Sequence, residues 1–465
     1  LDSGQTLCFV RHGQPCLPYD PGQSGLLLDS QRTHRPLFTE NRQKSGNDEI
    51  MSKLRAEVVT IDNQAVDHLL AFCNEHDLRE FVVVSDRNTR HVLGERVEAA
   101  LRGQGYSVLS AFFDEEKPVA DAHHIFHVML ACDAKPRTFV AVGSGTITDI
   151  TRFASHRTHA AFLSMPTAPS VDGFTSIGAP LIIDGIKTTV VCQPPRAIFA
   201  DLAVLANAPR AMIAAGFGDM MGKFTSVADF RLGRLLRGEP FDEEIAQRTA
   251  KSAQMCVDHA AEIATASPEG VRHLMDALVE SGYCMLDFGD SRPASGTEHH
   301  FSHFWEMKLL REGRPPILHG AKVGYGTIRA TELYEQLGQL SRDALSELLE
   351  GATLPDREAE IACIEAAYGE LAPDIIKTQR YFLEMTEAEF DALKARIWTH
   401  WAEIQAIGAA LLPSAEFRRL LQLVGGPTTP AALGLRDEEI EQGVNNAHYF
   451  RDRFTVRKLW HLLGE

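Results

Sequence analysis

Histidines that could bind a metal gather in the second half of the chain. Glu298-His-His-Phe-Ser-His303 is followed by His319, so four of the 19 histidines lie between residues 299 and 319. His299 and His303 are four residues apart and would share one face of a helix. Imidazole suits zinc, iron and nickel. The spacing predicts a divalent-metal site, with chance clustering or surface exposure of histidines as the alternative.

A third ligand is expected, because a catalytic metal site usually has three protein ligands and one open position. The best candidate is Asp219 in Gly216-Phe-Gly-Asp-Met-Met-Gly-Lys223, where glycines would let another element approach an acid within a helix. A rival metal site is formed by His123, His124 and His127 on one predicted helix. It lacks a nearby glycine or a well-placed acid, and we rank it lower.

A glycine-rich turn could hold the phosphates of a nucleotide. The apolar strand Thr138–Val142 runs into Gly143-Ser-Gly-Thr-Ile-Thr-Asp149 and then into a helix. Absent side chains let the backbone approach a pyrophosphate, and the N-terminus of a helix favours anionic oxygens. A tight strand-to-helix connection without any ligand explains the same pattern.

Two further segments would fit a dinucleotide. Asp86 ends the strand Phe81–Ser85, where a carboxylate suits a ribose hydroxyl and favours NAD over NADP; its alternative is a helix N-cap. Met165-Pro-Thr-Ala-Pro-Ser-Val-Asp-Gly-Phe-Thr-Ser176 is a loop dense in hydroxyls, which suits a nicotinamide or polyol site. A series of structural turns is the other interpretation of that loop.

The elements around these residues change character along the chain. From Gln64 to about residue 207, apolar strands alternate with helices, which predicts a parallel sheet covered on both faces. The predicted helices are Ala65–Glu75, Val92–Gln104 and His123–Ala131, and the strands are Phe81–Ser85, Ser107–Phe113, Thr138–Val142, Ala161–Ser164, Leu181–Ile183 and Thr188–Cys192. After Pro209 only helical periods remain: Ala211–Leu236, Glu243–Ala266, Glu269–Val279, His299–Arg311 and most of Arg342–Val424.

This pattern predicts an irregular extension at 1–55, an α/β dinucleotide-binding domain at 56–207 and an all-helical metal- and substrate-binding domain at 208–465. Within the extension, Leu7–Val10 could form a short strand, and residues 20–47 are polar and without period. Leu7-Cys-Phe-Val-Arg-His-Gly-Gln14 resembles the phosphohistidine motif of histidine phosphatases. That fold needs more chain than is present there, so we interpret the match as coincidence or an inactive fragment.

Composition excludes several classes of protein. The chain has 465 residues, 44% hydrophobic and 23% charged, and a net charge of −17, so neither a nucleic acid nor an anionic membrane is an expected partner. No apolar run approaches the length of a membrane span. The eight cysteines contain no C-x-x-C pair, and several have apolar neighbours, as in Ala362-Cys363-Ile364. They predict reduced, mostly buried thiols in the cytoplasm, and no secretory signal is seen.

Taken together, the motifs resemble a known family. Gly143–Asp149, Pro166–Gly173, Gly216–Asp219, Glu298–His303 and His319–Lys322 occur in order. They look like those of the sn-glycerol-1-phosphate dehydrogenases, within the superfamily of iron-containing alcohol dehydrogenase, glycerol dehydrogenase and dehydroquinate synthase. The resemblance covers roughly residues 80–465. It includes Tyr449-Phe-Arg-Asp-Arg-Phe-Thr455, which is similar to the end of the bacterial branch.

The resemblance implies a dehydroquinate-synthase-like fold, with a cleft between a dinucleotide-binding domain and a helical domain. It implies that the metal ligands are Asp219, His299 and His319, and that Asp172, Asp219 and His303 contact substrate, with Asp172 and His303 as catalytic residues. The cofactor residues would be Asp86, Gly143, Gly145, Thr146, Ile147, Thr148, Asp149, Thr167, Ala168, Pro169, Ser170 and Ser176.

The resemblance also implies the reaction. The enzyme would reduce dihydroxyacetone phosphate reversibly to sn-glycerol 1-phosphate with NAD or NADP and one divalent metal, as a homo-oligomer. Lys223 stands where iron-dependent relatives carry a second histidine, which favours zinc or nickel over iron. Ser144 replaces a middle glycine of many relatives. A glycerol or other polyol dehydrogenase, a lyase resembling dehydroquinate synthase and a nucleotide-binding relative without catalysis are the alternatives.

Overall fold

The computed structural model describes residues 55–183 and 186–465. The expected strand at Leu7–Val10, the polar stretch 20–47 and the phosphatase-like motif lie outside the described residues. The described part belongs to one compact unit that extends from Glu49 to Glu465. A division near residue 207 is seen as a change from strands to helices within that unit, and the predicted domain boundaries stay a prediction.

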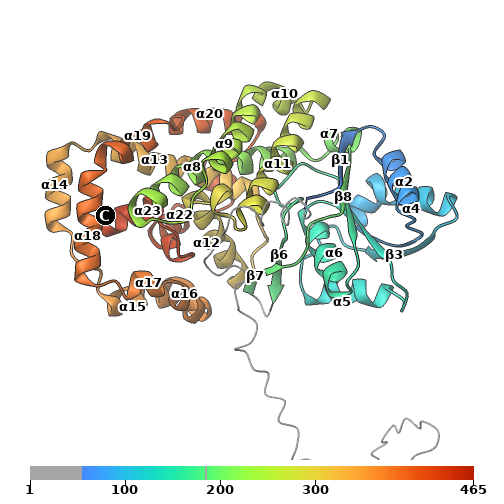
Figure 1. Cartoon of the computed structure of the whole chain (residues 1–465), viewed down its shortest axis with the longest axis horizontal. Coiled ribbons are helices and arrows are strands. Elements are labelled where there is room, and N and C mark those ends of the chain that lie inside the picture. The colour runs from blue at the N-terminus through green and yellow to red at the C-terminus, as the bar shows by residue number, and fades with distance from the viewer. Residues whose placement is uncertain (1–54, 184–185) are drawn as a thin grey trace, which may run out of the picture. The chain divides into compact units, whose positions relative to one another are not determined.

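Six parallel strands form a sheet in the order β1-β8-β5-β4-β2-β3 (Figure 1). They are β1 Val58–Asp62, β2 Glu80–Asp86, β3 Ser107–Phe113, β4 Thr138–Gly143, β5 Phe162–Pro166 and β8 Ala197–Asp201. The predicted parallel sheet is confirmed. Strands β1 and β8 were not predicted, although both are short apolar segments that end in an aspartate.

Helices cover the sheet on both faces. On one face, α2 Ala65–Glu75 and α4 Glu95–Gly103 bury Leu69 and Val97 against Val83 and Val140 of the sheet. On the other face, α5 Ala122–Ala131 and α6 Gly145–Arg157 pack on the alternate side chains of the same strands. The strands are therefore apolar throughout, because residues pointing to either face are buried. Between β2 and α4 lie α3 Arg87–Thr89 and a π-helical turn, η1 Arg90–Gly94, and α7 Leu202–Ala206 follows β8.

The last two predicted strands do not join the parallel sheet. β6 Gly178–Ile183 and β7 Ile186–Val191 pair with each other as an antiparallel hairpin. A short connection between two strands allows only antiparallel pairing, since a parallel pair needs a crossover of a dozen or more residues. The hairpin carries Lys187 toward the helical part of the chain, where its Nζ lies 2.8 Å from Glu306 Oε1.

The remainder of the described chain is helical, as predicted. The long helices that build the site are α8 Arg210–Arg237, α11 Pro268–Phe288, α12 Thr297–Arg311 and α13 His319–Gln339. The others are α9 Glu243–Asp258, α10 Ala260–Thr265, η2 Arg292–Ala294, α14 Arg342–Gly351, α15 Arg357–Tyr368, η3 Gly369–Leu371, α16 Ala372–Thr378, α17 Arg380–Leu383, α18 Glu387–Thr399, α19 Trp401–Ala409, α20 Ser414–Val424, α21 Pro430–Leu433, α22 Asp437–Asn446, η4 Ala447–Tyr449 and α23 Val456–Leu462.

Two details differ from the sequence-based expectation. The helix predicted at Glu243–Ala266 is two helices, because His259 leaves helical geometry with φ −111° and ψ 22°. Cys363 is exposed: the buried face of α15 is set by Glu360, Ile364 and Tyr368, and Cys363 lies beside that face. All six cysteines in the described ranges are free thiols, three of them buried. None of the helices within those ranges is both long and apolar enough to span a bilayer.

Candidate active site

Three predicted metal ligands from three helices meet in the structure. Asp219 lies in the middle of α8, His299 in the first turn of α12 and His319 at the start of α13. One ligand atom from each lies within 4.8 Å of the other two. Asp219 Oδ1 is 3.5 Å from His299 Nε2, and the two imidazole centroids are 5.2 Å apart. One carboxylate and two imidazoles form a donor set that suits a divalent transition metal.

Glycines let these helices approach with backbone against backbone. A Cβ at Gly218 would lie 2.3 Å from the carbonyl oxygen of Gly320, and one at Gly320 would lie 1.8 Å from that of Ala215. Gly222 makes room for side chains of both neighbouring helices, since a Cβ there would lie 2.6 Å from Val323 Cγ1 on α13 and 3.1 Å from Glu298 Cγ on α12. The expectation that glycines around Asp219 admit another element is confirmed, and this packing brings the acid to the histidines.

Glu298 orients the first histidine. Its Oε1 lies 2.7 Å from His299 Nδ1 and also accepts from Gly296 N, while Oε2 accepts from Thr225 Oγ1 at 2.7 Å. Burial raises the pKa of Glu298, but His299 and the other hydrogen bonds outweigh it and hold the pKa below its usual value. The carboxylate therefore accepts a hydrogen bond from the protonated Nδ1 of His299, and the unprotonated Nε2 faces Asp219.

Lys223 neutralises two aspartates inside the protein. Its Nζ lies 2.7 Å from Asp172 Oδ2, 3.0 Å from Asp219 Oδ1 and 3.1 Å from the carbonyl oxygen of Ala294. Although burial opposes the charged form, Asp172 and Asp219 hold the pKa of Lys223 above its usual value. The pKa of Asp219 is correspondingly low, because Lys223 and the two histidines outweigh the effect of burial.

Asp172 joins the loop after β5 to the metal ligands. Its backbone N–H donates to Asp219 Oδ2 at 3.1 Å, and its side-chain Oδ2 accepts from Ser281 Oγ at 2.9 Å. The close approach depends again on glycine, because a Cβ at Gly216 would lie 1.8 Å from the carbonyl oxygen of Pro169. The predicted substrate residue Asp172 and the predicted ligand Asp219 are thus direct neighbours.

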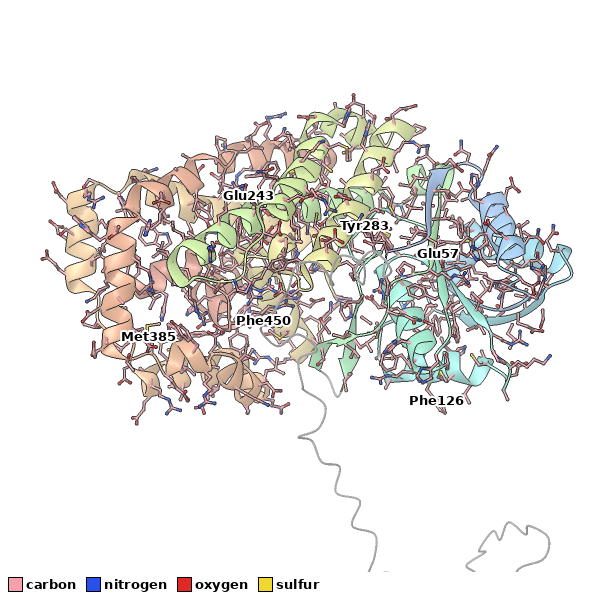
Figure 2. The ribbon with its side chains drawn as sticks, in the orientation of Figure 1. Glu57, Phe126, Glu243, Tyr283, Met385 and Phe450 are labelled. Atoms are coloured by element: carbon pink, nitrogen blue, oxygen red, sulfur yellow. The ribbon has the colours of Figure 1, made fainter. Side chains whose placement is uncertain are left out.

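His303 lies beside the three ligands, one turn after His299. Its ring centroid is 6.3 Å from that of His299, 5.8 Å from that of His319 and 4.8 Å from that of Phe450, which is labelled in Figure 2. Its Nδ1 is 3.6 Å from Glu306 Oε2. Burial lowers the pKa of His303 to about 3, although Glu306 acts in the opposite direction, so the ring is neutral at physiological pH.

Two lysines lie beside Glu306, near His303, and the sequence predicts no role for either. Lys187 Nζ lies 2.8 Å and Lys322 Nζ 3.3 Å from Glu306 Oε1. Lys322 is fully buried and its Nζ makes no hydrogen bond within the described residues. Burial lowers its pKa to about 8. The sequence carries a signal for Lys322 and Glu306 but none for Lys187. Lys322 follows His319 by three residues and Glu306 follows His303 by three, so each shares a helix face with a predicted site residue.

The glycine-rich turn has the geometry of an anion cradle. Gly143 ends β4, and a Cβ there would lie 2.5 Å from Ile147 Cβ. Ser144 is the N-cap of α6, but its side chain makes no capping hydrogen bond and instead pairs with Ser170 Oγ at 2.5 Å. The N-terminus of α6 therefore keeps its backbone donors for an outside acceptor, as a pyrophosphate site requires. Gly145, Thr146, Ile147, Thr148 and Asp149 form its first turns; burial raises the pKa of Asp149 to about 7.

The loop Thr167–Ser176 lies against that turn. Thr167 N donates to the carbonyl oxygen of Gly143 at 3.2 Å, and the contact between Ser170 and Ser144 continues the junction. The predicted cofactor residues at 143–149 and at 167–170 are thus brought together, whereas Ser176 Oγ donates to Gly173 O. Fully buried Arg152 fixes the loop by donating to the carbonyl oxygens of Gly173, Phe174 and Gly178. No sequence motif marked Arg152.

Asp86 lies at the same edge of the sheet as Gly143. Val84 is paired with Ala141 in the register of β2 and β4, and Asp86 and Gly143 each come two residues later. Asp86 Oδ1 accepts from Thr89 N at 2.8 Å in a capping box. The helix-cap interpretation is therefore seen in the structure, and ribose binding by Asp86 stays a prediction.

The rival histidines do not assemble a metal site. No group of three donors among the described residues includes His123, His124 or His127. His124 instead pairs with Asp121 at 2.8 Å and with Glu115 at 3.3 Å.

The chain is similar to known proteins over most of its length. A family model described as iron-containing alcohol dehydrogenase matches residues 60–209. A relative from Halalkalibacterium halodurans, named glycerol-1-phosphate dehydrogenase [NAD(P)+], is 37% identical over 406 residues, covering 87% of this chain and 92% of the relative. A relative of the same name from Geobacillus thermodenitrificans is 38% identical over 404 residues, covering 86% of this chain and 91% of the relative.

Solved structures share the fold. A probable glycerol dehydrogenase from Sinorhizobium meliloti superposes with a TM-score of 0.56 at 18% identity, covering 88% of this chain and 97% of that one. An iron-containing alcohol dehydrogenase from Corynebacterium glutamicum gives a TM-score of 0.56 at 14% identity, covering 88% and 94%. At these identities the likeness establishes the predicted fold class, an α/β half followed by a helical half.

Proposed function

The chain belongs to the glycerol-1-phosphate dehydrogenase family, and on that premise we propose that it catalyses the reversible reduction of dihydroxyacetone phosphate to sn-glycerol 1-phosphate with NAD or NADP. The observation that carries the proposal is the hydrogen bond from Asp172 N to Asp219 Oδ2. Through it, the loop that lies on the glycine-rich turn also touches the cluster of metal donors. A hydride-transfer enzyme needs a nucleotide and a polarised substrate in such proximity.

In this proposal, Asp219, His299 and His319 hold one divalent metal. A metal bound there supplies a Lewis acid for the substrate's C2 oxygen. Glu298 keeps His299 Nε2 available for the metal, and Gly218 and Gly320 hold the helices at bonding distance. We favour zinc, with nickel or iron as alternatives, because two imidazoles and a carboxylate suit borderline metals and Lys223 offers no second histidine on α8.

The dinucleotide would lie across the carboxyl edge of the sheet. The α6 N-terminus would bind the pyrophosphate, and Thr167–Ser170 with Ser176 would orient the nicotinamide ring; a bound NAD or NADP would supply the hydride chemistry. Asp86 favours NAD over NADP, because a carboxylate at the ribose repels a 2′-phosphate.

Charge beside His303 supports a phosphorylated substrate. The ammonium groups of Lys322 and Lys187 lie beside Glu306 Oε1. The phosphate of the substrate could accept hydrogen bonds from both. A substrate bound between them and the metal ligands would have Asp172 and His303 within its surroundings. His303, neutral at physiological pH, keeps a lone pair that can accept a hydrogen bond from the C2 hydroxyl and relay its proton.

We further propose a cytoplasmic homo-oligomer. The free thiols of the described cysteines support a reducing compartment. Phe126, labelled in Figure 2, and Leu130 are 62% and 69% exposed on α5, and such an apolar surface supports contact with a second copy.

The direct test is reduced-nicotinamide absorbance after loading the metal-free protein with zinc, nickel or iron. We expect oxidation of NADH that depends on dihydroxyacetone phosphate and does not occur with unphosphorylated dihydroxyacetone. Asp219→Asn should lose metal and turnover together, whereas Asp258→Asn, at an exposed position of α9, should keep both.

Other outcomes would overturn the proposal in distinct ways. Oxidation of glycerol without activity on the phosphorylated pair would identify a polyol dehydrogenase. Substrate consumption without any net change in NADH would identify a lyase. Full metal content and turnover in Asp219→Asn would refute the ligand assignment.

A further inference from the structure

A second cluster of donors lies near the C-terminus, and the proposed reaction uses none of it. It consists of Glu360 on α15, His448 in η4 and His461 on α23; α15 and α23 are labelled in Figure 1. One ligand atom of each lies within 4.8 Å of the other two, the same limit that Asp219, His299 and His319 satisfy. Among the described residues, these two clusters are the groups of three donors that lie close enough together to hold one metal ion.

The cluster is preorganised by hydrogen bonds to Glu360. His461 Nε2 lies 2.9 Å from Glu360 Oε1, and the Tyr449 hydroxyl donates to Glu360 Oε2. The His448 ring is next to the His461 ring, with centroids 4.3 Å apart and planes at 31°. Glu360 and His448 are buried, and His461 is partly buried. Two ligands are therefore in contact before any ion binds, and the third ring lies against them.

His448 is the independent observation that points to a ligand. Its side chain is 1% exposed, and neither Nδ1 nor Nε2 makes a hydrogen bond of ordinary geometry with the described residues, although the ring lies near the backbone of Asn445. Buried polar atoms almost always have a hydrogen-bond partner, and a buried polar atom without a protein partner indicates a site for a water, an ion or a ligand. A buried imidazole that contacts a second imidazole and a carboxylate is well suited to coordinate a cation.

Coordination needs only a small contraction of the cluster. Zinc bonds nitrogen and oxygen at about 2.0–2.2 Å, so ligand atoms in a tetrahedral site lie about 3.3–3.6 Å apart. The Glu360–His461 contact of 2.9 Å would widen by a few tenths of an ångström, and His448, whose ligand atom lies within 4.8 Å of both, would approach by at most about 1.5 Å. Two histidines with one glutamate is an established zinc donor set, with a fourth position open to water.

We propose that Glu360, His448 and His461 form a second divalent-metal site, separate from Asp219, His299 and His319, that binds zinc or a similar borderline cation. The site would fasten α23 to α15 and to the turn at residue 448. It stabilises the C-terminal helix, which in turn supports the core, since Val456 N at its start donates to the buried Asp229 on α8.

The neighbouring positive charge does not occupy the cluster. Lys458 Nζ donates to Gln379 Oε1 and lies 4.3 Å from the centroid of the Phe382 ring. Arg457 Nη1 donates to the carbonyl oxygen of Glu465 at 2.8 Å. Both cations have partners of their own, so the two imidazoles and the carboxylate remain available to an ion.

Metal stoichiometry tests the proposal. Tag-free protein is saturated with Zn²⁺, freed of excess, and analysed by inductively coupled plasma mass spectrometry. We expect two equivalents in the wild type, one in Asp219→Asn and one in His448→Gln, with dehydrogenase activity kept in His448→Gln. His400→Gln is the matched control. His400 also pairs with a glutamate, since its Nδ1 lies 2.7 Å from Glu403 Oε1, but it belongs to no three-donor group. The His400→Gln variant should retain two equivalents.

Thermal unfolding gives a second readout that separates this site from the first. In the Asp219→Asn background, Zn²⁺ should raise Tm by about 3 °C or more, and adding Glu360→Gln or His448→Gln should abolish the rise. Should His448→Gln fail to fold, Glu360→Gln, which is nearly isosteric, carries the test. One equivalent in the wild type that Asp219→Asn removes, or an equal Tm rise with and without Glu360, would overturn the second site and leave the proposed reaction untouched.

Discussion

Lys223 Nζ lies 3.0 Å from Asp219 Oδ1, one helical turn away on α8, and both side chains are fully buried. The same ammonium contacts Asp172. Without it, two carboxylates would face each other inside the protein. The lysine is therefore the residue that lets an acidic metal ligand stay ionised when no metal is bound.

The first prediction removes that charge. Lys223→Met should destabilise the metal-free protein by about 3–5 kcal/mol, the usual cost of leaving a buried charge without its partner. Zn²⁺ should restore part of this loss, because a cation on Asp219 replaces the ammonium. Urea unfolding with and without metal measures both effects. A metal-free variant as stable as the wild type would show that Lys223 is not needed to neutralise the pair.

The second prediction concerns the carboxylate behind His299. Glu298→Gln removes the charged acceptor of His299 Nδ1, and metal affinity should fall by about 10- to 100-fold, as for other residues that orient a metal ligand. Turnover at saturating metal should fall much less. Thr225→Val removes the hydroxyl that donates to Glu298 Oε2 at 2.7 Å and to the carbonyl oxygen of Gly222 at 3.2 Å but leaves the carboxylate in place. It is the graded control and should lower the affinity less. A competition titration with a zinc chelator measures each value.

The sequence predicts part of the site, but not the roles of Glu298 and Lys187. The order of motifs predicts Asp219, His299 and His319 as metal ligands, and the structure brings these three donors within 4.8 Å of one another. Periodicity predicts the sheet and the long helices. The sequence predicts no role for Glu298, because adjacency to His299 does not reveal which ring nitrogen the carboxylate contacts. Lys187 could not be predicted at the site, since it reaches Glu306 through a hairpin 119 residues away in sequence.

The strands were predicted less completely for a related reason. β8 supplies Ala197–Asp201 between β1 and β5, yet four apolar residues and an aspartate shortly after a pair of prolines carry no period that distinguishes a strand from a loop. Its position depends on pairing with β5 and with β1, which begins 139 residues earlier. Long-range pairing of this kind is set by tertiary packing, and no local pattern encodes it.

The third prediction tests the backbone contact between α8 and α13. Gly320→Ala would place a Cβ 1.8 Å from the carbonyl oxygen of Ala215, so the helices must separate and the metal ligands with them. We expect loss of at least about 3 kcal/mol of stability and weaker metal binding. Gly338→Ala is the control on the same helix: it is exposed with nothing within 4 Å, and should be stabilising by about 0.5–1 kcal/mol. Equal effects at both positions would contradict the packing argument.

The last prediction uses the pH dependence of Lys322. Burial lowers its pKa to about 8, against an ordinary value of 10.5, so the ammonium is present below pH 8 and is lost as the pH rises through that value. If it binds the substrate phosphate, KM for dihydroxyacetone phosphate should rise above pH 8, approaching tenfold per pH unit in the limit.

Lys322→Met should raise KM at pH 7 by about 10- to 100-fold, the value of a charged hydrogen bond, and should remove the pH dependence of KM. Lys187→Met, whose lysine shares Glu306 Oε1 but is partly exposed, should raise KM less. Unchanged KM in Lys322→Met would place the phosphate elsewhere, because no other described ammonium at Glu306 is fully buried.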